Sequence, residues 1–201
     1  MKPQTRPHDP KQGKLVLLMG PSGVGKSVIL KELRRRHPEF HFPRSATTRP
    51  RRPREGDDLY HFVTDAGFDH LLSEEKFLEW AVVHQGARYG TLLEEITPPI
   101  EAGKIVIREV DVQGFESICT HPLFAGTSAR YVLQSIFIAP ENTEQLIARI
   151  KKRAPISEEE LARRIASMEK ELAYAPLCSV KVVNREGQLE EIVAEVERRI
   201  R

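Results

Sequence analysis

The stretch KLVLLMGPSGVGKSVILKELRRR, residues 14–36, decides how this chain folds. In the segment Lys14–Met19, every residue after the lysine is apolar. Such a continuous apolar run is typical of a strand buried on both faces of a parallel sheet. From Ser27 to Arg36 the apolar residues recur on one side of a helical period, and Pro38 ends the pattern. The stretch therefore predicts a buried strand, a glycine-rich turn and a helix, in that order.

The glycine-rich turn, residues 20–27, fits the pattern G-x-x-x-x-G-K-[ST] at every fixed position. Glycines let successive backbone N–H groups converge on phosphate oxygens, and the following helix N-terminus also favours an anion. We expect Lys26 to reach the β- and γ-phosphates of a nucleoside triphosphate and the Ser27 hydroxyl to ligate Mg²⁺. The alternative is a chance turn before a helix, which the flanking strand and helix disfavour. The predicted phosphate-binding set is Gly20, Pro21, Ser22, Gly23, Val24, Gly25, Lys26 and Ser27.

The rest of the chain alternates strand and helix patterns at both ends, which predicts an α/β fold with a parallel sheet core. Buried-strand patterns occupy residues 104–112, 131–139 and 180–184, and helical patterns occupy 141–153, 157–174 and 188–200. Ser157 and Glu160 form a predicted capping box at the start of one helix.

The region from residue 43 to residue 97 breaks this alternation, so we predict an inserted subdomain there. Its Arg- and Pro-rich start, 43–56, has no strand or helix period and is predicted to be an ordered loop or an irregular edge. The patterns that follow are a strand at 59–63, a helix at 65–76, a strand at 77–83 and a helix at 91–102 that two prolines interrupt.

The composition narrows the class of protein. Lys and Arg number 31 against 29 Asp and Glu, for a net charge of +2, which does not favour a general nucleic-acid or membrane binder. No stretch reaches the ~18 apolar residues that cross a bilayer. The polar first residues, 1–12, are predicted to be a flexible leader without a signal-peptide core, so a cytoplasmic location is the default expectation. Cys119 and Cys178 match no metal-ligand spacing and are expected to be reduced, partly buried thiols.

The segment Ser45–Arg52 carries threonines followed by closely spaced arginines. Phosphoryl transfer needs two anionic substrates held in line, and Arg suits bidentate phosphate contact. A solvated Arg-rich loop or an RNA-binding arm is the alternative, and the segment alone does not decide between them.

Seven blocks together resemble guanylate kinase, in the family's order and from about residue 13 to the C-terminus. The blocks are residues 20–27, Ser45–Arg52, Tyr60-x-Phe62, Phe77-Leu78-Glu79-Trp80-Ala81, Tyr89-Gly90-Thr91, Asp111-Val112-Gln113-Gly114 and the Arg-spaced helices with Arg149, Arg153 and Arg164. The resemblance implies a P-loop three-layer core of about 13–43, 98–146 and 168–201. It also implies an acceptor-binding insert at about 44–97 and a helical lid at about 147–167.

The resemblance also implies site residues. The acceptor phosphate would be held by Ser45, Arg49, Arg52, Tyr60 and Tyr89, and the guanine would be recognised by Glu79 and Thr91. One carboxylate can accept from both N1–H and the 2-amino group of guanine, an arrangement that adenine lacks. Taken alone, Glu79 could equally be a solvent-facing strand residue.

Other implied roles concern ATP and the metal. Arg149, Arg153 and Arg164 would contact ATP phosphates and transition-state charge as the lid closes, and Asn184 would contact the adenine. Asp111 lies at the end of a predicted buried strand, where a carboxylate is costly unless it is paired or used. It would position Mg²⁺ or the acceptor, or else be a structural carboxylate that caps the region of the phosphate-binding loop. Glu169, Lys170 and Glu171 are expected to form a solvated face.

The chain departs from the family pattern at several points. The segment 53–58 is one residue short, and one residue is added between Glu79 and Tyr89. Glu109 replaces Asp, and Arg108 occupies a position where an apolar residue is usual; Ala154 replaces Gly. These changes put the identity of the acceptor in more doubt than kinase activity.

The leading hypothesis is therefore transfer of the γ-phosphoryl group of ATP to GMP, and also to dGMP, with Mg²⁺. One alternative is a same-fold kinase for another phosphorylated acceptor such as ribose 1,5-bisphosphate, which has no base for Glu79 and Thr91 to recognise. The other is an inactive binding module, although such modules typically lose the lysine of the phosphate-binding loop. The sequence does not determine whether the protein is a monomer or a homo-oligomer.

Overall fold

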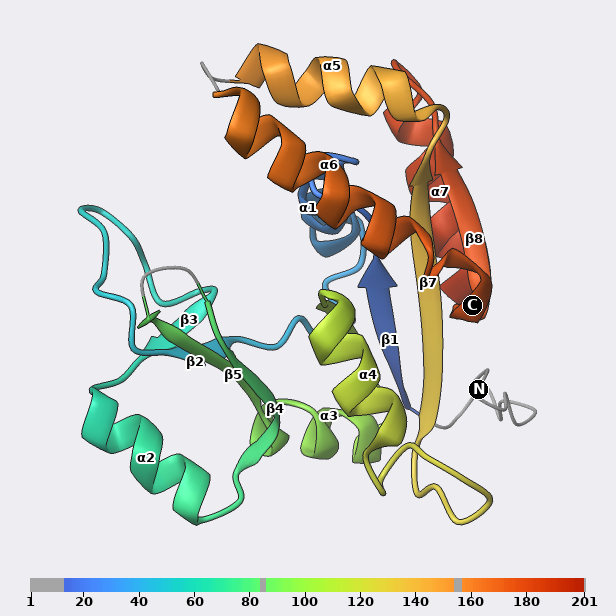
Figure 1. The fold of residues 1–201 in the computed structure, drawn as a ribbon. Helices are drawn as coiled ribbons and strands as arrows, with labels where there is room; N and C mark the ends of the chain where they lie inside the picture. The colour runs from blue at the N-terminus through green and yellow to red at the C-terminus, as the bar shows by residue number, and fades with distance from the viewer. Residues whose placement is uncertain (1–12, 84–85, 154–156, 201) are drawn as a thin grey trace.

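The computed structural model describes residues 13–83, 86–153 and 157–200, and its core is a four-stranded parallel sheet in the order β6-β1-β7-β8. Helices cover both faces of this sheet, so the predicted three-layer α/β core is confirmed (Figure 1). The strands are β1 (Lys14–Met19), β6 (Ile105–Glu109), β7 (Val132–Pro140) and β8 (Val180–Asn184). The covering helices are α1 (Lys26–Arg36) and α7 (Leu189–Ile200) on one face, and α3 (Thr97–Glu101) and α4 (Val112–Thr120) on the other.

Strand β1 is apolar from Leu15 to Met19 because both of its faces are covered. Leu15 and Leu17 lie in one hydrophobic cluster with Phe115 of α4, whereas Val16 lies in a second cluster with Leu33 of α1. Every residue of β1 is buried. The continuous apolar run therefore reports a central strand, as the sequence predicted.

A second four-stranded sheet lies beside the core, in the order β3-β2-β5-β4 (Figure 1). Helix α2 packs on it through Phe68, which is fully buried with Ala46 and Leu92. The elements are β2 (Ser45–Thr47), β3 (Tyr60–Phe62), α2 (Asp65–Ser73), β4 (Phe77–Val82) and β5 (Arg88–Leu92), followed by the short 3-10 helix η2 (Leu93–Glu95).

A polar cluster centred on Glu95 joins the two sheets. The Glu95 carboxylate accepts from Arg44 Nε at 3.2 Å and lies 2.7 Å from His61 Nε2 of β3. His41, which bridges to Val106 of β6, lies 3.3 Å away on the same carboxylate. Burial raises the pKa of Glu95, but its hydrogen bonds to His61 and Arg44 outweigh that effect, and the net shift is downward.

Two helices, α5 (Thr143–Arg153) and α6 (Glu158–Leu172), lie over the carboxyl end of β1 (Figure 1). Leu146 and Ile150 of α5 and Met168 of α6 pack into the same cluster as α1. The Ser157 hydroxyl accepts from the Glu160 backbone N–H at 3.2 Å, which confirms the serine half of the predicted capping box. The 3-10 helix η3 (Ala175–Leu177) then leads to β8.

Three predictions of secondary structure need correction. The predicted strand over 104–112 ends at Glu109, and Val112 instead begins α4, which the sequence pattern did not reveal. The predicted helix over 91–102 is wrong at its start, because Thr91 belongs to β5. Its prolines do not interrupt α3 but lie in its first turn, where no N–H is needed for a helical hydrogen bond. The predicted loop over 43–56 contains the three-residue strand β2, which is too short to show a period.

Both cysteines are free and at least partly buried, as predicted. Burial raises the pKa of Cys119 to about 12 and that of Cys178 to about 11, so neither thiol is poised for reaction. Within the described residues, no helix is both long and apolar enough to cross a bilayer. The predicted leader, residues 1–12, lies outside the described residues.

Candidate active site

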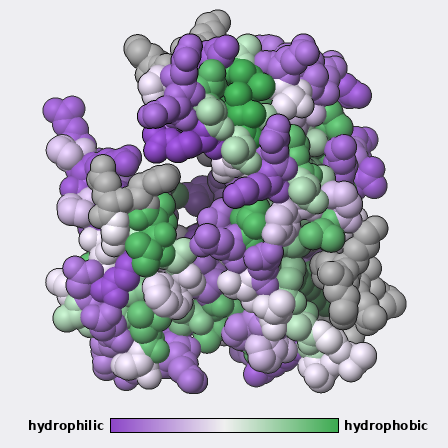
Figure 2. Space-filling view, viewed as in Figure 1, coloured by the Kyte–Doolittle hydropathy of each residue, from purple (hydrophilic) through white to green (hydrophobic). Residues whose placement is uncertain are grey.

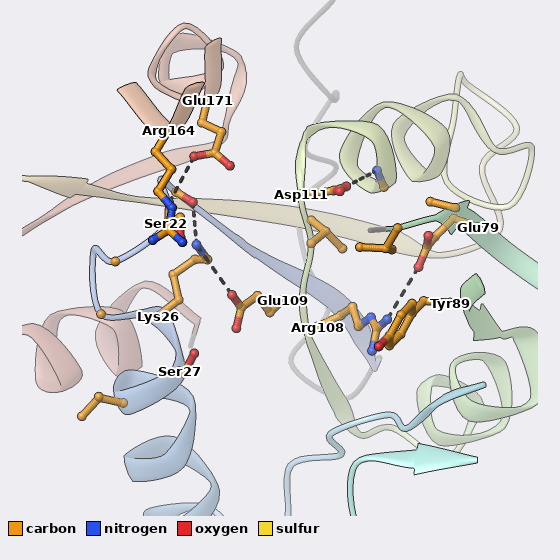
Figure 3. Close-up of a pocket in the computed structure, with 18 of the residues that line it drawn as sticks. Ser22, Lys26, Ser27, Glu79, Tyr89, Arg108, Glu109, Asp111, Arg164 and Glu171 are labelled. Carbon is orange, nitrogen blue, oxygen red and sulfur yellow. Dashed lines mark hydrogen bonds and ion pairs between the residues drawn. The ribbon is translucent and has the colours of Figure 1, made fainter. Parts of the chain in front are cut away.

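A cavity of about 890 Å³ lies between the glycine-rich turn, the second sheet and α6. Figure 2 shows a hollow between the second sheet and the α5–α6 pair, with hydrophilic side chains around it. Figure 3 shows Lys26 and Ser22 at one end, Glu79 and Tyr89 at the other, and Glu109 between them. The predicted site residues that line the cavity are Gly20, Ser22, Gly23, Gly25, Lys26, Ser27, Tyr60, Glu79, Tyr89, Asp111 and Arg164.

The glycine-rich turn has a backbone that only glycine tolerates at its ends. Gly20 has φ 144° and Gly25 has φ 106°, and a Cβ on Gly20 would lie 2.2 Å from the carbonyl oxygen of Ile138. Val24 anchors the turn, because its side chain is buried and its N–H donates to the Pro21 carbonyl at 3.2 Å. The backbone of the turn is therefore held by contacts within the protein.

Asn184, at the end of β8, donates from Nδ2 to the Val24 carbonyl at 2.6 Å. This bond ties the turn that follows β1 to β8, which lies two strands away in the sheet. Contact between Asn184 and adenine stays a prediction.

The Lys26 side chain folds over the turn. Its Nζ donates to the Gly20 carbonyl at 2.6 Å and to the Pro21 carbonyl at 3.2 Å, and lies 3.6 Å from Glu109 Oε1. The ammonium group of Lys26 therefore lies at the glycine-rich turn, where its positive charge would attract phosphate oxygens.

The acceptor end is built from one row of residues across the second sheet. In register, Tyr60 of β3 pairs with Ser45 of β2, Ser45 pairs with Thr91 of β5, and Thr91 pairs with Glu79 of β4. Tyr89 lies two residues from Thr91 and so shares its face of the sheet. Four segments that are distant in sequence thus present their predicted acceptor residues side by side.

Glu79 faces the cavity and not the solvent. The Glu79 side chain is 11% exposed. The next residue, Trp80, lies on the other face of the sheet and is 46% exposed. The buried Thr91 hydroxyl donates to Glu79 Oε1. Arg108 Nη2 lies 3.6 Å from the same oxygen. The alternative of an ordinary surface carboxylate is therefore wrong.

Arg49 lies next to this row. Its Nε donates to the Tyr89 hydroxyl at 3.0 Å, and its guanidinium lies 5.3 Å from the centre of the Tyr60 ring. Both terminal nitrogens donate to Glu55, at 2.7 and 3.0 Å, and these bonds lower the Glu55 pKa to about 2. The backbone N–H of Arg52 also donates to Glu55, while the Arg52 side chain is exposed.

Comparison with known proteins now decides the family. A family model described as guanylate kinase matches residues 12–201. The chain belongs to the guanylate kinase family. It is 39% identical to a guanylate kinase from Nostoc sp. over 90% of this chain and 86% of the relative. It is 41% identical to one from Thermosynechococcus vestitus, over 87% of each chain, and 41% identical to one from Thermobifida fusca, over 85% of this chain and 83% of the relative.

The guanylate kinase fold is supported separately by structure. A crystal structure of guanylate kinase from Anaplasma phagocytophilum matches with a TM-score of 0.66, over 94% of this chain and 85% of that chain. The two sequences are 21% identical, so this likeness shows the fold alone.

The residues predicted to bind the metal are Ser27 and Asp111, and both line the cavity. Asp111 Oδ1 already accepts from the Gly114 N–H at 2.8 Å, so Asp111 also caps α4. Glu109 lies nearer the phosphate end, beside Lys26. In the described part of the chain, no group of three or more His, Cys, Asp or Glu could hold a metal ion. This donor set fits Mg²⁺ that arrives with a nucleotide and keeps phosphate and water ligands.

Two residues at the phosphate end had no signal in the sequence. Glu171 of α6, expected in a solvated face, instead accepts from the Ser22 backbone N–H at 3.1 Å. Burial raises the pKa of Glu171. Glu109 was noted only as a departure from the family, and its pairing with Lys26 depends on β6 lying beside β1. Neither contact has a sequence period or motif.

Of the three predicted lid arginines, the structure describes the side chain of Arg164. Arg164 of α6 lines the cavity and donates from Nε to Glu160 at 3.0 Å. The side chains of Arg149 and Arg153 lie outside the described residues, as does Ala154. Their contact with phosphate stays a prediction.

Proposed function

We propose that this guanylate kinase uses the cavity to hold Mg²⁺·ATP at the glycine-rich turn and GMP at the second sheet, in line for phosphoryl transfer. Membership of the family establishes the reaction, ATP-dependent phosphorylation of GMP to GDP. The observation that supports these roles is that one cavity is lined by Lys26 and Ser27 at one end and by Glu79 and Tyr89 at the other (Figure 3).

At the donor end, backbone N–H groups of the turn and Lys26 Nζ hold the β- and γ-phosphate oxygens. For Lys26 to do so, Nζ exchanges its carbonyl partners, Gly20 and Pro21, for phosphate oxygens. Arg164 adds positive charge from α6. As the γ-phosphorus bonds to an oxygen of the acceptor phosphate, its bond to the β–γ bridging oxygen breaks, and ADP carries away the electron pair.

Mg²⁺ would be held by the Ser27 hydroxyl. Glu109 and Asp111, which line the same cavity, would orient the ion or its waters. When bound, Mg²⁺ neutralises charge on the transferring phosphates.

At the acceptor end, Arg49 and the hydroxyls of Tyr60, Tyr89 and Ser45 hold the GMP phosphate. Arg49 is already oriented by Tyr89 and Glu55, so little side-chain entropy is lost on binding. Arg52, exposed in the same segment, is assigned as a second phosphate ligand.

Guanine is assigned to Glu79 and Thr91. The Glu79 carboxylate accepts from N1–H and the 2-amino group, and Thr91 fixes the carboxylate through its hydrogen bond. Closure of α5 and α6 over the cavity would exclude water and limit hydrolysis of ATP. A cytoplasmic location stays a prediction.

The test is ADP release from Mg²⁺·ATP across GMP, dGMP, AMP, UMP, CMP and ribose 1,5-bisphosphate. We expect turnover with GMP and dGMP and very little with the others. Strong turnover with AMP and none with GMP would overturn the assignment of Glu79. Turnover with the sugar bisphosphate alone would instead favour the acceptor that has no base.

A further inference from the structure

Arg108 lies at the acceptor end of the cavity with hydrogen-bonding capacity that the described residues leave unused. Its side chain is 17% exposed and its one acidic neighbour in ion-pair range there is Glu79, with Nη2 3.6 Å from Oε1. Its Nε is buried and has no hydrogen-bond partner in the described part of the chain. The side chain also lines the cavity, so a ligand there that brings an acceptor would meet the remaining donors of the guanidinium.

The position of the guanidinium limits what that acceptor can be. Strand β6 directs Arg108 away from Lys26 and toward the second sheet, and Figure 3 shows its guanidinium beside Glu79 and Tyr89. Of the residues assigned to the acceptor phosphate, Ser45 and Tyr60 lie farther along the row that begins at Glu79, whereas Tyr89 lies beside Arg108. Arg108 therefore lies next to the residue assigned to the base.

The edge of guanine needs one group that Glu79 cannot supply. That edge presents N1–H and the 2-amino group as donors, with the O6 acceptor next to N1. An ionised carboxylate only accepts, so Glu79 can satisfy the two donors but not O6. The single hydroxyl proton of Thr91 is donated to Glu79 itself. Arg108 places a further donor beside the same Oε1.

We propose that Arg108 is a specificity-determining residue that donates a hydrogen bond to the 6-oxo group of the acceptor purine. The inference rests on the proposed function and deepens it. Adenine has an amino group at position 6 and an unprotonated N1, so it would place donor against donor and acceptor against acceptor. Discrimination would then come from both members of the Arg108–Glu79 pair. Burial lowers the pKa of Arg108, and the nearby Glu79 opposes that shift.

The test uses acceptors that differ from GMP at one position. In 6-thio-GMP a sulfur, which is a weaker acceptor, replaces O6, and IMP lacks only the 2-amino group. We would measure kcat/KM and equilibrium binding for GMP, 6-thio-GMP and IMP with the wild type, Arg108→Leu and Glu79→Gln. Arg108→Leu should lower kcat/KM for GMP by roughly tenfold or more, mainly through a higher KM. It should also bring the ratio of kcat/KM for GMP to that for 6-thio-GMP close to one. Its GMP to IMP ratio should stay at the wild-type value, while Glu79→Gln should show the reverse pattern.

Three further proteins keep the test decisive. Arg130→Leu removes an exposed arginine that pairs with Glu101 outside the cavity, and should change neither ratio. Arg108→Lys retains a donor and should recover part of the preference for GMP over 6-thio-GMP. If Arg108→Leu leaves Glu79 uncompensated and fails to fold, the Arg108→Leu, Glu79→Gln double variant removes both charges and should lose both preferences.

The proposal is overturned if Arg108→Leu weakens GMP and 6-thio-GMP by the same factor, because that result indicates a phosphate or structural role. It is also overturned if neither acceptor is affected. Failure of the proposed function is a separate result, namely wild-type protein that binds GMP but transfers no phosphoryl group to it.

Discussion

The two ends of the cavity are built in different ways. The donor end comes from one continuous segment, residues 20–27, held between β1 and α1 and fastened by Asn184. The acceptor end comes from four strands, whose residues Tyr60, Ser45, Thr91 and Glu79 meet only because the strands pair in one register. A change at the donor end should therefore affect chemistry with little effect on the fold. A change at the acceptor end should affect selectivity, and stability where the row is tightly packed.

The largest expected effect is at the donor end. Lys26→Ala removes the cation that holds the transferring phosphates, so kcat for ADP release should fall by roughly a thousandfold. The lysine makes its hydrogen bonds within the turn, so the thermal unfolding midpoint should stay within a few degrees of the wild type. Unchanged turnover would remove Lys26 from the site, and loss of the fold would show that the donor end is not locally determined.

The second effect is at the acceptor end. Glu79→Gln exchanges one acceptor oxygen for an amide donor that faces a donor of guanine. We expect kcat/KM for GMP to fall by a factor that corresponds to a loss of about 1–3 kcal/mol of transition-state binding. KM for ATP should be unchanged. Steady-state kinetics with each substrate varied in turn would measure this. An equal loss for both substrates would contradict the separation of the two ends.

A smaller effect is expected where α6 meets the donor end. The Glu171 carboxylate accepts from the Ser22 N–H, which also faces the phosphate site, so an ionised Glu171 should disfavour bound ATP. Glu171→Gln should lower KM for ATP a few-fold. Burial raises the pKa of Glu171, and protonation removes its negative charge. In the wild type, KM for ATP should therefore fall as pH falls through that pKa. The variant should lack this component, and the ratio of the two proteins' KM values across pH measures it. A constant ratio would exclude Glu171 from ATP binding.

The smallest effect concerns the pH dependence of stability at Arg49. The pKa of Glu55 is lowered in the folded protein to about 2, chiefly by its hydrogen bonds from Arg49. A lowered pKa contributes stability above the unfolded-state value, 4.5, and this contribution is lost as pH falls toward about 2. Glu55→Gln should therefore reduce the loss of stability between these pH values, as measured by urea unfolding. Glu94→Gln, at another exposed carboxylate, is the control and should follow the wild type.

The sequence determined the donor end and much of the core. The pattern of residues 20–27, the apolar run of β1 and the amphipathic period of α7 each depend on neighbours in the chain, and local spacing reveals such features. The bounds of β1 and β8 were predicted correctly for the same reason. The likeness to the family supplied Glu79, Thr91 and Tyr89, which spacing alone could not have distinguished from surface strand residues.

Only the tertiary structure decided how the acceptor end is completed. Nothing local relates Arg108 to Glu79, Glu171 to Ser22 or Glu109 to Lys26, since each pair joins elements that meet through sheet pairing or helix packing. Likewise, Asp111 became a helix cap because β6 ends two residues before it, where the chain turns into α4. The physical reason is range: hydrophobic period and backbone conformation act over a few residues. The field around a buried charge depends on whichever chain segment the fold brings within a few ångströms.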